Sequence, residues 1–244
     1  MGKDINNSMI YIIETALIVL LPLISIPIIV NKLSPSDFGV FILATVYSSV
    51  LIALTNFGML TGYERDYFLY EDCANKSSEL ITSVMLFVAL NMMIVFVFVY
   101  YWQVEISFLL FGQGVYGNLL FVVLVGTGLT SISEYYRTYL KNKGFAKKNV
   151  VINVVRGLSN FIFTLFFLLY IEMGLLALAY GLILSGLISL LLSLTLQFLN
   201  LPPKLNKTMF FDVLKLSLPL TPRILFGVIS TQFDKIMLSL ITTT

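Results

Sequence analysis

Residues 9–30 read MIYIIETALIVLLPLISIPIIV, an apolar stretch in which Glu14 is the only charged residue. The hydrocarbon core of a bilayer is about 30 Å thick, and roughly 20 apolar residues of helix cross it. This stretch therefore predicts a membrane-spanning helix. It is too long for a secretory signal and no small-residue cleavage site follows it, so we expect it to stay in the mature protein.

Further apolar stretches of similar length follow along the chain. A bilayer offers no hydrogen-bonding partners to an exposed backbone, so helices rather than an open sheet must cross it. The predicted fold class is all-α: a polytopic transmembrane helix bundle with a six-helix N-terminal lobe at 1–200. Residues 201–244 are expected to form a cytoplasmic linker and a seventh helix that opens an incomplete second lobe. After 9–30, the spans are expected at 38–60, 80–101, 118–140, 150–170, 174–196 and 213–238.

Lysine and arginine residues fall almost entirely into every second gap between these spans. The opposite gaps hold only Lys32. By the positive-inside rule, the lysine-rich gaps face the cytoplasm. We therefore predict a multi-pass protein of the bacterial cytoplasmic (inner) membrane whose cytoplasmic parts are the N-terminus, 61–79, 141–149 and 197–212. The basic residues concerned are Arg65, Lys76, Lys141, Lys143, Lys147, Lys148, Lys204, Lys207 and Lys215.

Composition excludes several kinds of site. The chain has no histidine, and its single cysteine, Cys73, has no intramolecular partner, so we expect no metal site, no disulfide and an inert thiol. A Gly-rich nucleotide loop is also absent, and no cofactor is expected. The net charge of +2 gives no reason to expect a nucleic-acid partner. The 102–117 segment, which contains Trp102, is expected either to lie at the outer interface or to be a plain connecting loop.

Polar residues recur along single faces of several predicted spans. Because polar groups are costly in lipid, such faces normally point into the bundle or toward a water-filled cavity. The span at 174–196 differs, since small residues recur there every four positions, which is typical of close helix packing. The polar faces consist of Thr127, Thr130, Ser131, Glu134, Arg137, Thr138 and Lys141; of Asn149, Asn153, Arg156, Asn160 and Thr164; and of Arg223, Gly227, Ser230, Thr231 and Asp234.

Two arginines and two glutamates are predicted to share the cytoplasmic half of the bundle. One interpretation is internal pairing that only orients the helices, with Glu134 bound to Arg137 one turn away and Glu14 bound to Arg156. The other is that the arginines contribute to a substrate site, because the fixed donors of a guanidinium match phosphate oxygens. The sequence leaves both open.

Arg223 is harder to explain by internal pairing. No acid lies within one turn of it, and its position predicts a depth near the middle of the membrane. An arginine facing lipid at that depth would be very costly, so we expect it to face an aqueous cavity.

Several short segments of the chain form a recognisable pattern. They are Leu21-Pro22-Leu23 with Ile26-Pro27, LSPSDFGVF at 33–41, Asn56-Phe57-Gly58 with Gly62 and Arg65, LKLSLPLTP at 214–222, and DKIML at 234–238. Together these segments span nearly the whole chain. They resemble the bacterial polysaccharide flippases, the O-antigen and capsule transporters of the multidrug, oligosaccharidyl-lipid and polysaccharide exporter superfamily.

The resemblance implies a carrier of undecaprenyl-pyrophosphate-linked oligosaccharides from the cytoplasmic to the periplasmic leaflet. It implies two six-helix lobes around a central cationic cavity that work by alternating access. Arg223, Arg156 and Arg137 are our own candidates for holding the pyrophosphate. The expected partners are the lipid-linked oligosaccharide, membrane lipids and proteins of glycan assembly. The chain departs from the family pattern after its seventh span, so the second half is expected in cis or in trans.

Three other functions stay open at this point. A multidrug or cation antiporter of the same superfamily would depend on a membrane carboxylate, for which Glu14, Glu134 and Asp234 are the candidates. A glycan polymerase or ligase would need a sizeable periplasmic loop, whereas the outer gaps here are short. A scaffold in a glycan-assembly complex would not transport at all. In the flippase interpretation the protein is not an enzyme and has no catalytic residues.

Overall fold

The computed structural model describes residues 2–70, 74–201 and 203–242, and all regular structure within these ranges is helical. Seven stretches of the described chain are long and apolar enough to cross a membrane, which confirms the predicted number of spans. In chain order the elements are α1 (Gly2–Lys32), α2 (Pro35–Thr55), α3 (Met59–Leu69), α4 (Ala74–Phe111), the 3-10 turn η1 (Gly114–Tyr116), α5 (Gly117–Asn142), α6 (Ala146–Leu169), α7 (Leu176–Asn200), α8 (Lys207–Ser217), η2 (Leu218–Leu220) and α9 (Thr221–Thr242).

The start of α2 is set by its capping residues. The Ser34 hydroxyl accepts a hydrogen bond from the Asp37 amide at 3.1 Å and donates to the Asp37 carboxylate at 2.7 Å. Pro35 occupies the first turn, where its missing amide hydrogen costs nothing. The helix therefore begins three residues before the predicted boundary at 38.

The end of α2 and the following loop differ from the prediction. Phe57 and Gly58 both have positive φ angles, 46° and 67°, and this left-handed pair ends the helix before residue 60. The 61–79 segment, predicted as a loop, contains most of α3 and the start of α4. The charged residues of α3 lower the hydropathy, so a search for apolar runs does not detect this helix.

A tyrosine-rich core lies beneath α3. Tyr63 and Tyr67 of α3 are fully buried, together with Tyr135 and Tyr136 of α5. The ring centroids of Tyr63 and Tyr135 are 6.2 Å apart. Tyr136 donates a hydrogen bond to the Leu196 carbonyl of α7 at 3.0 Å. These contacts fix one end of the bundle.

Helix α4 continues well beyond the predicted end at 101. Trp102 has non-helical backbone angles, and the helix resumes after this kink to Phe111. Most of the 102–117 segment is therefore helical and continues α4, rather than forming a plain loop. The exposed side chains of Trp102 and Phe108 lie on this extension.

Helix α7 packs closely against α5 and α6, as its small residues predicted. A Cβ added to Gly126 of α5 would lie 2.8 Å from the Ile183 amide of α7, and one added to Gly181 would meet the Thr164 hydroxyl of α6. These glycines allow the helix backbones to approach each other. The small residues that α7 buries at this contact are Ala177, Gly181, Ser185, Ser189 and Ser193.

The predicted seventh span is two helices rather than one. Pro219 and Pro222 interrupt the backbone hydrogen bonds, so α8 ends at Ser217 and α9 begins at Thr221 after the turn η2. The 197–212 segment, predicted as a linker, contains the start of α8. Its first turn is capped by Asn206, whose side chain also donates to Glu79 of α4 at 2.8 Å.

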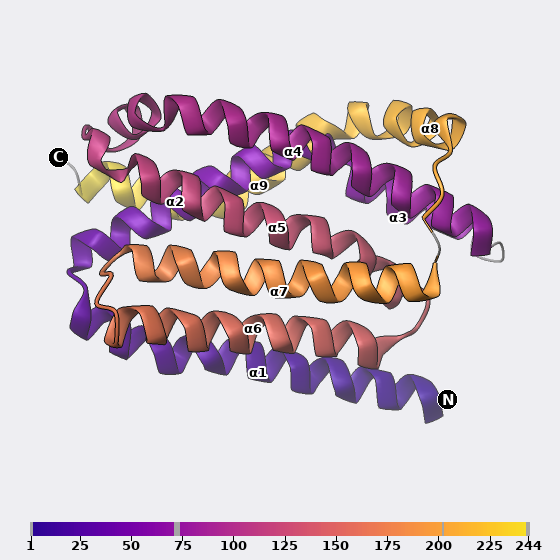
Figure 1. Cartoon of the computed structure of the whole chain (residues 1–244), viewed down its shortest axis with the longest axis horizontal. Helices are drawn as coiled ribbons and strands as arrows, with labels where there is room; N and C mark the ends of the chain where they lie inside the picture. The colour runs from indigo at the N-terminus through magenta and orange to yellow at the C-terminus, as the bar shows by residue number, and fades with distance from the viewer. Residues whose placement is uncertain (1, 71–73, 202, 243–244) are drawn as a thin grey trace.

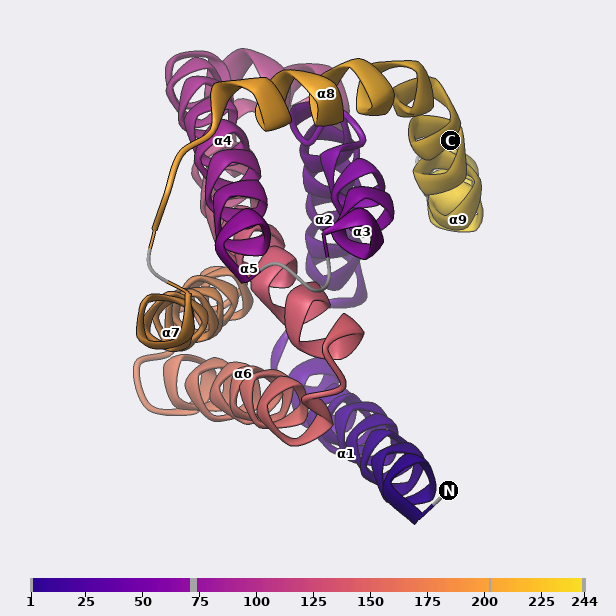
Figure 2. The ribbon, with the colours of Figure 1, turned by 90° about the vertical axis from the view of Figure 1, so that its right-hand side faces the viewer.

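The helices form two groups joined by α5 (Figures 1 and 2). Helices α1, α6 and α7 lie on one side, and α2, α3, α4, α8 and α9 on the other. The N-terminal end of α1, the α5–α6 turn, α3 and the start of α8 all lie at the right-hand end of Figure 1. The segments predicted to share one side of the membrane therefore lie at one end of the bundle.

Candidate functional site

The centre of the candidate site is a charged network between α1 and α5. Arg137 donates a hydrogen bond to Glu134, one turn away on α5, with 2.7 Å between Nη1 and Oε2. Its other terminal nitrogen lies 3.8 Å from Oε1 of Glu14 on α1. The side chain of Glu134 is 40% exposed and that of Glu14 only 8%. Arg137 thus joins a buried carboxylate to a half-exposed one.

Two asparagines extend this network onto α6. Asn153 donates a hydrogen bond to Glu14 and accepts two from Arg156, at 2.9 and 3.2 Å. Asn149, one turn earlier, accepts a hydrogen bond from Nε of Arg137 at 3.2 Å. The structure therefore connects Glu14 to Arg156 through Asn153, and the direct ion pair considered from the sequence is not formed.

Helix spacing explains why these side chains meet. Asn149, Asn153 and Arg156 recur at i, i+4 and i+7 on α6, so they lie on one face of that helix. Helix α6 packs against α1 and α5, which brings Glu14 and Arg137 to this face. The sequence indicated the polar stripe but not the bridging role of the two asparagines, whose amides can donate and accept together.

The arginines of the network differ in their electrostatic compensation. Arg137 lies against two carboxylates, Glu134 and Glu14. Arg156 is partly buried, and among the described residues it forms no ion pair, only the hydrogen bonds to the neutral Asn153. Arg156 is therefore the better placed of the two to attract an anion.

The structure does not bring Arg223 and Asp234 into this network. Both lie on α9, which packs mainly against α2, and both are exposed. Figure 2 shows α9 on the far side of the bundle from α6. Within the described residues neither side chain has an ion-pair partner, so Arg223 is a second cation without a compensating acid.

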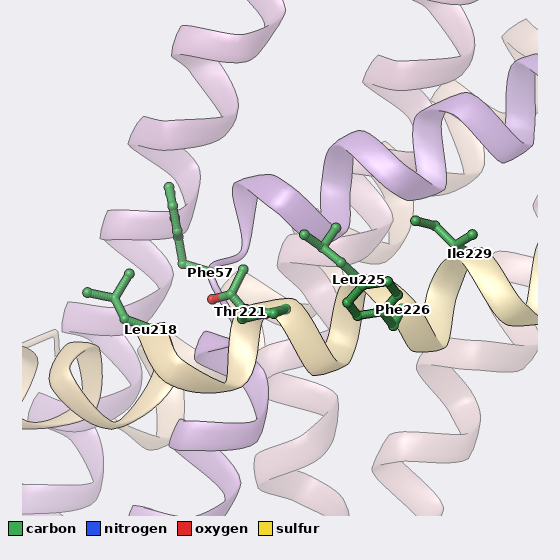
Figure 3. Close-up of a pocket in the computed structure, with 7 residues that line it drawn as sticks. Phe57, Leu218, Thr221, Leu225, Phe226 and Ile229 are labelled. Carbon is green, nitrogen blue, oxygen red and sulfur yellow. The ribbon is translucent and has the colours of Figure 1, made fainter.

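An open apolar groove lies between α2 and α9, the helix that carries Arg223. It encloses about 380 Å³ between the end of α2 and the first turns of α9. Figure 3 shows Phe57 on one side of the groove and the α9 side chains on the other. Arg223 follows Pro222 of the lining in the sequence and is not itself a lining residue. The lining residues are Phe57, Leu218, Thr221, Pro222, Leu225, Phe226 and Ile229.

The described residues contain no group of three or more histidine, cysteine, aspartate or glutamate side chains that could hold a metal ion. Cys73 lies outside the described residues, so its predicted inertness is not examined by the structure. The chemistry that the candidate residues offer is the binding of an anion by guanidinium groups, with one buried and one half-exposed carboxylate beside Arg137.

The chain is similar to a known protein family and to known structures. The model of a family described as "Polysaccharide biosynthesis protein" matches residues 5–244. No curated protein matches the chain. An outward-facing multidrug resistance MATE family transporter of the MOP superfamily is similar with a TM-score of 0.67 and 16% identity, over 91% of this chain and 52% of that one.

A second solved structure, MATE in complex with Br-NRF, is similar with a TM-score of 0.63 and 18% identity, over 95% of this chain and 57% of that one. At these identities the similarity shows the fold. The chain spans about half the length of both transporters.

Proposed function

We propose that this chain, which belongs to the polysaccharide biosynthesis protein family, is one half of a flippase for undecaprenyl-pyrophosphate-linked oligosaccharides. The flippase moves these lipids from the cytoplasmic to the periplasmic leaflet of the bacterial inner membrane. The family match and the multi-pass helical fold support a transporter, and the charged residues support a phosphate-bearing substrate.

The observation that carries this proposal is that two arginines lack an ion-pair partner. Arg156 and Arg223 form no ion pair with an acid among the described residues, although both lie on predicted membrane spans. A membrane protein retains such costly residues where they act on an ion or substrate. A pyrophosphate supplies the missing negative charge and accepts several hydrogen bonds from a guanidinium. We assign Arg137 a mainly structural part, because Glu134 and Glu14 already compensate it.

The groove between α2 and α9 suits the other end of such a substrate. Its lining is almost wholly apolar, which matches an isoprenoid chain better than a sugar. We propose that Arg223 contacts the pyrophosphate while the adjoining hydrocarbon lies against Phe226 and its neighbours.

Transport by alternating access needs two halves that move against each other around a central site. The chain has seven candidate spans in its described residues, of which we propose that the first six form one half, and it covers about half of a transporter that shares its fold. We propose that the second half is supplied in cis or in trans, and that glycan-assembly proteins deliver the substrate. The lysine-rich end of the bundle, with the N-terminus, faces the cytoplasm.

A multidrug or cation antiporter is the second candidate, and the burial of Glu14 is the observation that favours it. An antiporter uses a carboxylate within the membrane to bind its coupling ion. Glu14 is only 6% exposed and reaches both α5 and α6. Asp234, which is exposed on α9, is a weaker candidate for the same role.

Complementation of a flippase-deficient strain tests the proposal. The chain together with a second lobe should restore surface polysaccharide, and the chain alone as a monomer should not. Resistance to cationic drugs without restored polysaccharide would favour the antiporter. Restoration by a monomer of this chain alone would contradict the requirement for a second half.

A further inference from the structure

The turn between α5 and α6 carries the densest positive charge of the chain. We call residues 141–148, which read KNKGFAKK, the lysine turn. All four of its lysines are exposed, and the sequence has no aspartate or glutamate between Glu134 and Glu172. Among the described residues, Lys141, Lys147 and Lys148 have no acidic partner. The charge of these three lysines is therefore not balanced by an acid of the described chain.

Two of these lysines occupy an unfavourable place in a helix. Lys147 and Lys148 lie in the first turn of α6, where the helix dipole is positive and favours an anion. Phe145, which precedes that turn, offers no side-chain hydrogen bond to the free amides. Ser34 and Asn206 cap α2 and α8 with their own side chains, whereas α6, like α3, α5 and α7, has no side-chain cap. An external anion would accept hydrogen bonds from the free amides of α6, as the capping side chains do in α2 and α8.

An exposed aromatic ring lies among these charges. Phe145 is 45% exposed, and the ammonium of Lys148 lies 5.3 Å from the centre of its ring. Beside it, Gly144 has a φ of 75°, and a Cβ added there would meet no atom within 4 Å. At membrane interfaces, aromatic rings commonly enter the lipid boundary while neighbouring lysines reach the headgroups. Phe145 and Lys148 form such a combination.

The other lysines at this end of the bundle have different surroundings. The ammonium of Lys204 donates to Asn75 at 3.0 Å, and the neighbouring Asn206 holds Glu79. Lys207 and Lys215 share α8 with the acidic Asp212. The α8 region thus has mixed charge, which makes it a matched control for the lysine turn.

We propose that the lysine turn binds the phosphate headgroup of a lipid at the membrane surface. Clustered lysines next to membrane spans attract anionic headgroups, and here the first turn of α6 adds amide donors. The site lies outside the charged network, since Lys141 is one turn beyond Arg137 toward the end of α5. It does not rest on the identity of the transported substrate.

Lipid binding by the purified protein tests this site. Native mass spectrometry should detect bound phosphatidylglycerol, and much less phosphatidylcholine with the same acyl chains. The double variant Lys147→Gln/Lys148→Gln should bind phosphatidylglycerol at least about tenfold more weakly. The control Lys204→Gln/Lys207→Gln removes the same charge from the same end and should bind almost normally. Raising the salt concentration should weaken binding by the unsubstituted protein, a result independent of how the variants fold.

A second arm with undecaprenyl pyrophosphate identifies the source of the headgroup. Binding of phosphatidylglycerol supports a bulk bilayer lipid, and binding of undecaprenyl pyrophosphate alone supports the carrier lipid. Equal retention of phosphatidylcholine, or an equal loss of binding in the control variant, would overturn the proposal. If the unsubstituted protein bound the lipid but did not support glycan export, that result would count against the proposed function and not against this site.

Discussion

Asn153 on α6 donates a hydrogen bond to Glu14 on α1, two residues that lie 139 positions apart in the sequence. Through this contact and the approach of Arg137 to the same carboxylate, three helices meet at one buried group. Glu14 therefore links α1 to both α5 and α6.

Removing Arg137 should destabilise the protein more than removing Glu134. Arg137→Met leaves the buried Glu14 without its cation, and breaking a buried pair costs about 3 to 5 kcal/mol. Glu134→Gln should reduce stability less, because the Glu134 side chain is 40% exposed and Arg137 retains its ion pair with Glu14. Thermal unfolding of the purified protein measures both. The double variant Glu14→Gln/Arg137→Met should recover stability relative to Arg137→Met, and a further loss would contradict a structural pair.

Arg156 and Arg223 should be required for glycan export. Arg156→Ala and Arg223→Ala each remove a cation that forms no ion pair among the described residues, so export should be abolished while protein abundance in the membrane is kept. Lysine at either position should restore export only in part, because it lacks the two-pronged donor geometry. Lys32→Ala, at the opposite end of the bundle, is the control. Normal export by the alanine variants would refute the role.

Gly181 should not tolerate even one added methyl group. A Cβ at this position would meet the Thr164 hydroxyl in the contact between α7 and α6, and overpacking costs about 1 to 3 kcal/mol. Gly181→Ala should therefore lower the unfolding temperature, and Thr164→Ala in the same chain should recover part of the loss. Gly227→Ala is the control, since no atom lies within 4 Å of a Cβ there. If Gly181→Ala and Gly227→Ala changed the unfolding temperature equally, the close packing of α7 against α6 at Gly181 would be contradicted.

Stability should vary with pH through Asp66 on α3. Burial raises the pKa of this carboxyl, Arg65 partly lowers it, and Asp212 raises it. A raised pKa in the folded state means that stability is greatest in acid and declines as pH rises through that pKa. Asp66→Asn should reduce this decline in unfolding temperature and stabilise the protein at neutral pH. An unchanged pH profile in Asp66→Asn would show that this carboxyl is not involved.

The ends of the bundle should lie on opposite sides of the membrane. In a protein without Cys73, a cysteine at Lys143 should be labelled by an impermeant thiol reagent only from the cytoplasmic side. A cysteine at Val115, which is 83% exposed in η1, should be labelled from outside. Equal labelling of the two from outside would contradict the orientation drawn from the lysines.

The sequence predicted the spans well because hydropathy follows directly from composition, and it predicted the packing role of Gly181 because small residues recur at helical spacing. It missed α3, because that short helix combines charged residues with buried tyrosines. It also missed the separation of α8 from α9, although Pro219 and Pro222 could have indicated it. The contact of Asn153 with Glu14 could not be predicted, since it depends on which helices become neighbours in space. The roles of Arg137, Arg156 and Arg223 stay predictions.

Translocation in proteoliposomes tests the proposed function most directly. The protein is reconstituted with a second lobe, in the same chain or supplied separately, and a fluorescent undecaprenyl-pyrophosphate-linked oligosaccharide is followed between leaflets by quenching from outside. We predict translocation by the unsubstituted protein and none by Arg156→Ala/Arg223→Ala. Transport of a drug cation by this preparation, with the lipid-linked oligosaccharide left in its original leaflet, would contradict the flippase and favour the antiporter.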